Sequence, residues 1–250
     1  MSRIRFLNTQ IDNLTMNEAV ENITKLIEDK NNSYVVTPNL DHIVMLESDT
    51  EFFQAYKNAD LILADGKPLI WISKLLKNPI KEKISGSDLF PQICKMSSKK
   101  GFSIFILGAA EGVAEQAAKN LINKYRNLKI AGVYSPPFGF ENDNEEINKI
   151  IEMVSSLKPD ILAVSLGSPK GEKFIYRYKD SMNIPLSISI GATIDFEAGN
   201  VKRAPKWMSN AGLEWLYRMM KEPRRLAKRY LNDACKIVPI YFKYKERNIK

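Results

Sequence analysis

Short apolar segments alternate with amphipathic helical segments over the first 200 residues, and this alternation limits the possible folds more than any other feature. The apolar segments are rich in β-branched residues and apolar at consecutive positions, as expected of strands buried on both faces of a parallel sheet. Such strand–helix units predict an α/β fold with a doubly wound sheet. The predicted strands lie within residues 33–39, 61–66, 102–108, 129–135, 160–167 and 185–192.

The segments between these strands have helical periodicity. Thr15 and Glu18 have the spacing of a capping box, in which two residues cap each other's backbone N–H groups. Residues 41–59 are helical in period and are expected to divide into two helices. The predicted helices lie within residues 15–29, 41–59, 67–77, 85–100, 111–126, 144–157 and 169–180. We therefore expect a mostly parallel, Rossmann-like sheet covered by helices.

The last fifth of the chain differs in composition, so we divide the chain into an α/β catalytic domain, residues 1–199, and a basic helical appendage, residues 200–250. The appendage holds 14 Lys and Arg against 4 Asp and Glu, which leaves 23 against 25 for the other residues. Pro223 separates two amphipathic helices, since proline interrupts a helix, and an apolar, aromatic stretch, residues 237–244, follows them. This pattern favours an anionic membrane surface as the partner. Nucleic acid and an ordinary solvated face are the alternatives.

Polar residues and glycines follow the predicted strands. In a doubly wound sheet, ligands bind at the carboxyl ends of the strands. The residues at these ends are Thr37, Asn39, Asp65, Gly66, Gly108, Gly167 and Gly191. The sequence therefore predicts a substrate site along this edge of the sheet.

Asp65 ends an apolar segment, where a carboxylate adds nothing to the burial of a strand. One interpretation is a cap for the helix that begins near Pro68, since Asp is common at that position. The other is a general base, which needs a pKa near or above its ordinary value and a hydroxyl group within reach. The sequence does not decide between them.

His42 is the only histidine, and this limits the chemistry. Nucleophilic schemes that depend on histidine are excluded unless His42 itself serves, and a site with several histidine ligands is excluded. The sequence has no D-x-D motif of the kind that holds a metal ion in many sugar transferases, so we expect no metal and no other cofactor. Cys94 and Cys235 indicate no disulfide framework, which favours a reducing compartment.

Two glycine-containing turns open predicted helices. Residues 105–112 lack the full G-x-G-x-x-G pattern, so they support a dinucleotide site only weakly. Residues 167–173 fail the P-loop spacing, so hydrolysis of a nucleoside triphosphate is not expected. Each turn is either a tight connection or a place where backbone N–H groups meet a diphosphate.

Seven segments, taken together and in this order, form a specific combination that covers nearly the whole chain. They are TPNLDH (37–42), ADGKPLIW (64–71), ISGSDLFP (84–91), FILGAAEG (105–112), SLGSPKGEKF (165–174), IGATIDFEAGNVKRAPKWM (190–208) and GLEWLYRMMKEPRRLAKRYL (212–231). On these segments the chain resembles the WecG/TagA/CpsF family of bacterial glycosyltransferases, and within it the N-acetylmannosaminyltransferases of wall teichoic acid synthesis.

The resemblance implies an inverting, metal-independent transfer of N-acetyl-D-mannosamine from its UDP donor to undecaprenyl-diphosphate-linked N-acetylglucosamine, which makes a β-1,4 bond. It implies that Asp65 is the catalytic base and that Thr37 and Asn39 lie near the donor sugar. It also implies that the appendage closes over the site and docks on the membrane. The candidate substrate-binding residues are Gly66, Lys83, Gly108, Gly167, Lys170, Gly191, Asp195, Arg218, Arg224 and Arg225.

Two departures from the family pattern concern the donor. Lys83 stands where the family usually has Arg, and lysine lacks the bidentate fork that arginine offers to phosphate. Gly171 stands where the family usually has Gln. A related transferase with another UDP-sugar donor is therefore the enzymatic alternative, and a nucleotide- or nucleic-acid-binding module is the non-enzymatic one.

The expected partners are a UDP-sugar, a lipid-linked diphosphate acceptor and an anionic membrane surface, but not nucleic acid. No apolar run reaches the roughly 18 residues of a spanning helix, and the N-terminus has no apolar signal segment. We therefore expect a cytoplasmic protein, peripheral on the inner face of the cell membrane. The sequence does not determine the oligomeric state, and a homo-oligomer stays open as an alternative.

Overall fold

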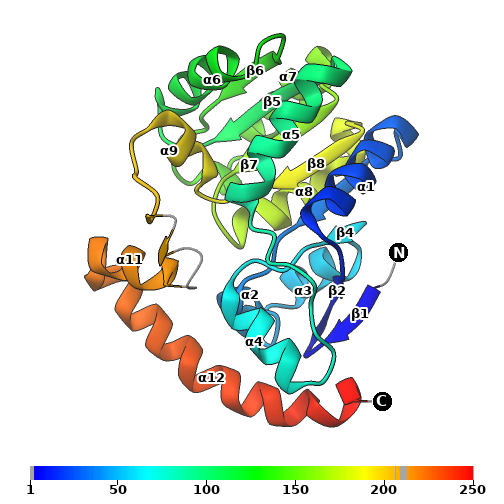
Figure 1. Ribbon diagram of the computed structural model, residues 1–250. Coiled ribbons are helices and arrows are strands. Elements are labelled where there is room, and N and C mark those ends of the chain that lie inside the picture. The colour runs from blue at the N-terminus through cyan, green and yellow to red at the C-terminus, as the bar shows by residue number, and fades with distance from the viewer. Residues whose placement is uncertain (1–2, 206, 209–212, 250) are drawn as a thin grey trace.

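The computed structural model describes residues 3–205, 207–208 and 213–249, apart from the side chains of residues 225 and 247–249. Within that part of the chain, six parallel strands form one sheet in the order β4–β3–β8–β7–β5–β6 (Figure 1). They are β3 (Ser33–Val36), β4 (Leu61–Ile62), β5 (Ser103–Gly108), β6 (Lys129–Tyr134), β7 (Ile161–Ser165) and β8 (Leu186–Ser189). Each lies in a predicted strand segment, so the predicted α/β fold with a Rossmann-like sheet is confirmed.

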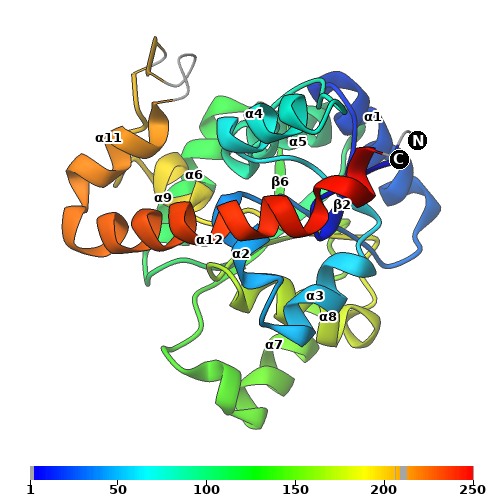
Figure 2. The same cartoon turned by 90° about the horizontal axis from the view of Figure 1, so that it is seen from below.

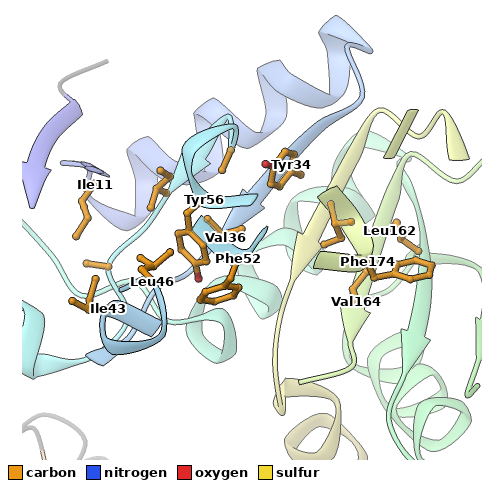
Figure 3. Packing of buried hydrophobic residues seen from close by; sticks show 14 of the residues in the cluster. Ile11, Tyr34, Val36, Ile43, Leu46, Phe52, Tyr56, Leu162, Val164 and Phe174 are labelled. Atoms are coloured by element: carbon orange, nitrogen blue, oxygen red, sulfur yellow. The ribbon is translucent and has the colours of Figure 1, made fainter. Parts of the chain in front are cut away.

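Helices cover both faces of this sheet, and successive strand residues enter different hydrophobic clusters. In β3, Tyr34 and Val36 belong to one cluster (Figure 3), whereas Val35 belongs to the other. The first cluster includes residues of α2 (Leu40–Met45), α3 (Thr50–Lys57), α4 (Lys67–Leu75), α7 (Asn144–Leu157) and α8 (Lys170–Met182). The second includes residues of α1 (Met16–Asp29), α5 (Gly86–Lys100), α6 (Val113–Lys124) and α9 (Thr193–Ala198). Burial on both faces explains why the strands are continuously apolar.

Local side-chain caps explain where several helices begin. The predicted capping box is present, since the Thr15 N–H donates to Glu18 Oε2 at 2.7 Å and the Glu18 N–H donates to Thr15 Oγ1. The segment 41–59 divides into α2 and α3, as predicted, and Asp49 caps α3 by accepting from the Phe52 N–H at 3.0 Å. A short 3₁₀ helix, η1 (Phe140–Asn142), precedes α7.

An N-terminal hairpin, which we did not predict, joins the edge of the body. It consists of β1 (Arg3–Phe6) and β2 (Thr9–Asp12), paired antiparallel. Asp12 is buried, accepts hydrogen bonds from Arg3, and accepts another from the Ile62 N–H of β4 at 2.8 Å. The buried carboxylate of Asp12 therefore ties the hairpin to the sheet edge that carries Asp65.

The appendage contains α11 (Glu214–Lys221) and α12 (Pro223–Ile249), which meet at the predicted break near Pro223. The long α12 runs along the body and packs against α2 (Figures 1 and 2). Residues 237–244, the apolar, aromatic stretch to which the sequence assigned no helix, continue α12 through Pro239, and Ile240 is buried against the body. Among the described helices, none combines the length and the apolarity needed to cross a membrane.

Candidate active site

A cleft opens at the carboxyl ends of β3 and β4, between the body and the two appendage helices. Its empty volume is about 840 Å³, including the space at its mouth, which is a size suited to a small molecule. The body lines it with Asn39, Leu40, Asp41, Asp65, Gly66, Lys67, Pro68, Lys83, Ser85, Ser87 and Phe196. The appendage lines it with Glu214, Trp215, Arg218, Arg229, Tyr230 and Asp233. The structure thus brings five predicted site residues together: Asn39, Asp65, Gly66, Lys83 and Arg218.

Backbone hydrogen bonds beyond β4 place Asp65 at this cleft. The Leu63 N–H donates to the Val36 carbonyl at 3.0 Å. The Asp65 N–H then donates to the Pro38 carbonyl at 2.8 Å, so the chain stays beside the end of β3. Gly66 turns the chain into α4 with a φ of 104°, a conformation that side chains disfavour. Asp65 is therefore the last residue held by the sheet edge before the turn.

The electrostatic surroundings of Asp65 raise its pKa from the ordinary value to about 7. Burial is the largest cause, and the carboxylates of Glu214 and Asp88 act in the same direction. The cations Lys83 and Arg218 oppose this rise. A carboxylate that titrates near neutral pH has the proton affinity that general-base catalysis requires.

The side chain of Asp65 does not cap α4. Gly66 occupies the N-cap position, and no side chain caps this helix start. Within the described residues, the Asp65 carboxylate makes no hydrogen bond. The geometry therefore favours the general-base interpretation over the helix-cap interpretation.

Lys83 belongs to an ion-pair network centred on Asp88. Lys83 Nζ lies 2.6 Å from Asp88 Oδ2, and Arg203 Nη2 lies 2.7 Å from Asp88 Oδ1. The Ser85 hydroxyl also donates to Asp88 Oδ2 at 2.6 Å. Burial alone raises the pKa of Asp88, but these hydrogen bonds outweigh it and lower the pKa to about 2. Asp88 is therefore ionised, and it fixes Lys83 near Asp65 while its other oxygen pairs with Arg203.

Of the polar residues Thr37, Asn39 and His42, which follow β3, only Asn39 lines the cleft. Asn39 caps α2 by accepting from the His42 N–H at 3.2 Å, and Thr37 is buried. His42 does not line the cleft: its Nδ1 is 2.7 Å from the Tyr56 hydroxyl, inside an aromatic cluster. Burial, helped by Arg229, lowers the pKa of His42 to about 3, so it stays neutral at physiological pH.

The three strand-end glycines lie at the same edge of the sheet but outside the 840 Å³ cleft. Gly108, Gly167 and Gly191 all have positive φ angles. At Gly108 a Cβ atom would overlap the backbone of Ser165, so only glycine fits there. The Ser165 hydroxyl donates to the Gly191 carbonyl at 2.5 Å and links the ends of β7 and β8.

The other predicted residues also lie outside this cleft. Lys170 forms an ion pair with Glu141 on another face. Asp195 lines a neighbouring pocket, which shares Arg218 with the cleft. Arg224 is exposed, and the side chain of Arg225 lies outside the described part of the structure. Among the described residues, no group of three or more His, Cys, Asp or Glu is arranged to hold a metal ion.

Sequence reasoning did not single out several charged residues at or beside this cleft, among them Asp88, Arg203, Glu214, Arg229 and Asp233. The first four lie inside the segments that resemble the family, so those segments contained a signal for them. Asp233 lies outside every such segment, and it reaches the cleft only because α12 packs against α2.

The chain is similar in sequence to known proteins over most of its length. The model of the glycosyl transferase WecG/TagA/CpsF family matches residues 4–250. An N-acetylglucosaminyldiphosphoundecaprenol N-acetyl-beta-D-mannosaminyltransferase from Bacillus subtilis (strain 168) is 33% identical over 199 residues, which are 80% of this chain and 75% of the relative. A protein of the same name from Bacillus spizizenii is 29% identical over 202 residues, 81% and 76% of the two chains. Another, from Staphylococcus aureus (strain MW2), is 27% identical over 242 residues, 96% and 91% of the two chains.

Proposed function

The chain belongs to the WecG/TagA/CpsF family of glycosyl transferases, and on that basis we propose that it transfers N-acetyl-D-mannosamine from UDP to undecaprenyl-diphosphate-linked N-acetylglucosamine. The names of the relatives in Bacillus and Staphylococcus support this donor sugar and this acceptor. The proposed product is the disaccharide of the wall teichoic acid linkage unit. The observation that carries the proposal is Asp65, a carboxylate of raised pKa at the strand-end cleft.

In the proposed reaction, Asp65 takes the proton of the acceptor 4-hydroxyl group. The resulting oxygen attacks the anomeric carbon of the donor sugar while the bond between that carbon and the UDP oxygen breaks. UDP leaves with the bonding electrons, and the configuration at the anomeric carbon inverts. A single carboxylate is enough for this displacement, because no covalent enzyme intermediate forms.

The departing diphosphate needs positive charge close to it. We propose that Lys83 and Arg218, which line the cleft, supply this charge together with Arg224 and Arg225, without a metal ion. Backbone N–H groups at the strand-end turns add neutral donors suited to phosphate. These turns contain Gly66, Gly108, Gly167 and Gly191. The proposed donor-side contacts also include Thr37, Asn39, Lys170 and Asp195.

We propose further that residues 200–250 form a membrane-associating appendage on the catalytic domain of residues 1–199, at the inner face of the cell membrane. Leu231, Val238 and Phe242 are 68%, 53% and 66% exposed. Their spacing places them on one side of α12, opposite the buried Asp233 and Ile240. Exposed apolar residues within a basic helix are suited to the surface of an anionic bilayer.

The direct test measures UDP release from UDP-N-acetylmannosamine with a lipid-diphosphate N-acetylglucosamine acceptor. We expect release that depends on the acceptor, persists in EDTA and falls by about a thousandfold or more in Asp65→Asn, as when a base is lost. Asp180→Asn, an exposed carboxylate on α8, is the matched control and should keep full activity. Full activity of Asp65→Asn would contradict the assignment of the base.

Lys83 and Gly171 favour one alternative, a transfer from another UDP-sugar to a cell-surface polysaccharide precursor. Gly171 lies in the first turn of α8 beside Ser189, where a Cβ atom would already lie 3.2 Å from the serine hydroxyl oxygen. A side-chain amide at this position would therefore crowd its neighbours. Competition between UDP-N-acetylmannosamine, UDP-N-acetylmannosaminuronic acid and UDP-glucose in the same assay separates the two hypotheses.

A further inference from the structure

One wall of the cleft holds buried polar atoms that the described residues leave unbonded. Arg229 and Asp233 lie one turn apart on α12 and line the cleft near Asp41 of α2. Arg229 Nη1 is 3.6 Å from Asp41 Oδ2. Arg229 Nε and Asp233 Oδ1 are buried, and no described residue hydrogen-bonds to either atom. Native proteins rarely leave such atoms unsatisfied, so these two indicate a ligand that completes their bonding.

The chemistry of this wall favours hydroxyl and amide groups over phosphate. Asp233 is 1% exposed, and its pKa is raised to about 6 by burial and by the neighbouring carboxylate of Asp41. Arg229 offers donors, Asp41 offers acceptors, and Asp233 offers either, according to its protonation. A sugar hydroxyl both donates and accepts, and therefore matches this mixture. A phosphate group would instead face two carboxyl groups against one guanidinium.

The position of this wall distinguishes the two sugars of the proposed reaction. It lies on α2 and α12, at the β3–β4 side of the sheet, whereas three of the four glycine turns, at Gly108, Gly167 and Gly191, lie at the ends of β5, β7 and β8. Trp215 and Tyr230 also line the cleft, with ring centroids 6.0 Å apart in an edge-to-face arrangement. Such rings provide an apolar surface for one face of a sugar, and Asp65 belongs to the same cleft.

We propose that Asp41, Arg229 and Asp233 form the subsite for the N-acetylglucosamine ring of the acceptor. This inference rests on the proposed function and assigns its acceptor side. The three side chains hold the ring hydroxyls and the acetamido group, and so present the 4-hydroxyl to Asp65. In this role they are specificity-determining residues, while the proton transfer itself belongs to Asp65.

The test uses the full chain and a short-chain alkyl diphosphate N-acetylglucosamine, which does not require a membrane. Arg229→Gln and Asp233→Ala should raise the KM for this acceptor at least tenfold and leave the KM for UDP-N-acetylmannosamine unchanged. Asp233→Asn keeps one donor and one acceptor, and should therefore show a smaller rise. Glu246→Gln removes an exposed acid from the same helix and is the matched control, with both KM values unchanged.

Calorimetric titration separates this inference from the proposed function. If the wild type binds the acceptor analogue but transfers no sugar, the proposed function fails, and weaker binding by Arg229→Gln still supports the subsite. An unchanged acceptor KM in the folded variants overturns the subsite. A rise of both KM values together with a lower melting temperature also overturns the subsite. In that case Asp41, Arg229 and Asp233 would only hold α12 against the body. Inorganic pyrophosphate that binds the wild type but not Arg229→Gln would identify a phosphate site instead.

Discussion

Asp65 is subject to two opposing requirements. As the proposed base it must be ionised, yet the fold half-buries it near the acidic groups Glu214 and Asp88. Lys83 and Arg218 compensate only in part, so the pKa stays near 7. The site therefore keeps a reactive carboxylate at some expense to stability, a common property of functional sites.

This conflict predicts how Asp65→Asn changes stability with pH. Because the folded pKa is about 7 and the ordinary value is 3.8, the folded state binds more protons between these two pH values. The free energy of unfolding of the wild type therefore falls as pH rises through this range, by at most about 4 kcal/mol. Asp65→Asn lacks this loss, so it should melt above the wild type at pH 8 and close to it at pH 4. Thermal unfolding checks this, and a lower melting temperature at pH 8 would contradict it.

Lys83 is predicted to set the pH at which the enzyme becomes active. Its charge lowers the pKa of Asp65, so Lys83→Met should move the acidic limb of the kcat/KM profile upward by about one pH unit. This shift is separable from weaker UDP binding, which lowers kcat/KM at every pH. Lys74→Met, an exposed lysine of α4, should leave the profile in place. An unshifted limb in Lys83→Met would show that the two groups are not coupled.

At the scale of elements, the turn at Gly108 requires glycine both for its positive φ angle and for lack of space. Gly112 shares the positive φ but not the crowding, so comparing the two positions separates these effects. Gly108 has a φ of +105°, and a Cβ atom there would overlap the Ser165 backbone. Gly112 has a φ of +76°, and a Cβ atom there would meet no neighbouring atom within 4 Å. We expect Gly112→Ala to cost about 1 kcal/mol, from backbone strain alone. Gly108→Ala should cost roughly 3 kcal/mol or more, because strain and overlap add. Equal costs in urea unfolding would contradict this account.

Elements stabilised by a local apolar pattern could be predicted from the sequence, whereas elements stabilised by contacts between distant residues could not. The six sheet strands were predictable, because burial on both faces leaves an unbroken apolar signal. The hairpin β1–β2 was missed, because its attachment depends on the distant contact between Asp12 and Ile62. The continuation of α12 through Pro239 was also missed, since the packing of Ile240 on the body outweighs the local helix-breaking signal.

At the scale of the whole molecule, the candidate site is made by two parts of the chain. Asp65 and Asn39 were predictable as strand-end residues, since topology alone fixes that edge. The approach of Arg229 and Asp233 was not predictable, because nothing in their local sequence specifies that α12 lies along α2. If the appendage also meets the membrane, as we propose, the same segment would serve both membrane contact and the assembly of the cleft.

Because the exposed apolar residues and the cleft residues lie on different sides of α12, we predict that membrane binding and chemistry can be separated by substitution. The triple variant Leu231→Gln, Val238→Gln, Phe242→Gln changes only exposed residues of α12, on the side away from the body. It should lose sedimentation with anionic vesicles, and its KM for the long-chain lipid acceptor should rise at least tenfold, because apolar insertion is lost. Its rate with the short-chain acceptor should be unchanged, since the cleft residues are intact.

A matched triple variant, Leu75→Gln, Ile122→Gln, Leu157→Gln, removes three exposed apolar residues from the body instead. It should sediment with anionic vesicles as the wild type does. If the α12 variant still sedimented while the body variant did not, the membrane would meet the α/β domain rather than the appendage. In that case the lipid-linked acceptor would approach Asp65 from the other side of the cleft, and α12 would serve only to close it.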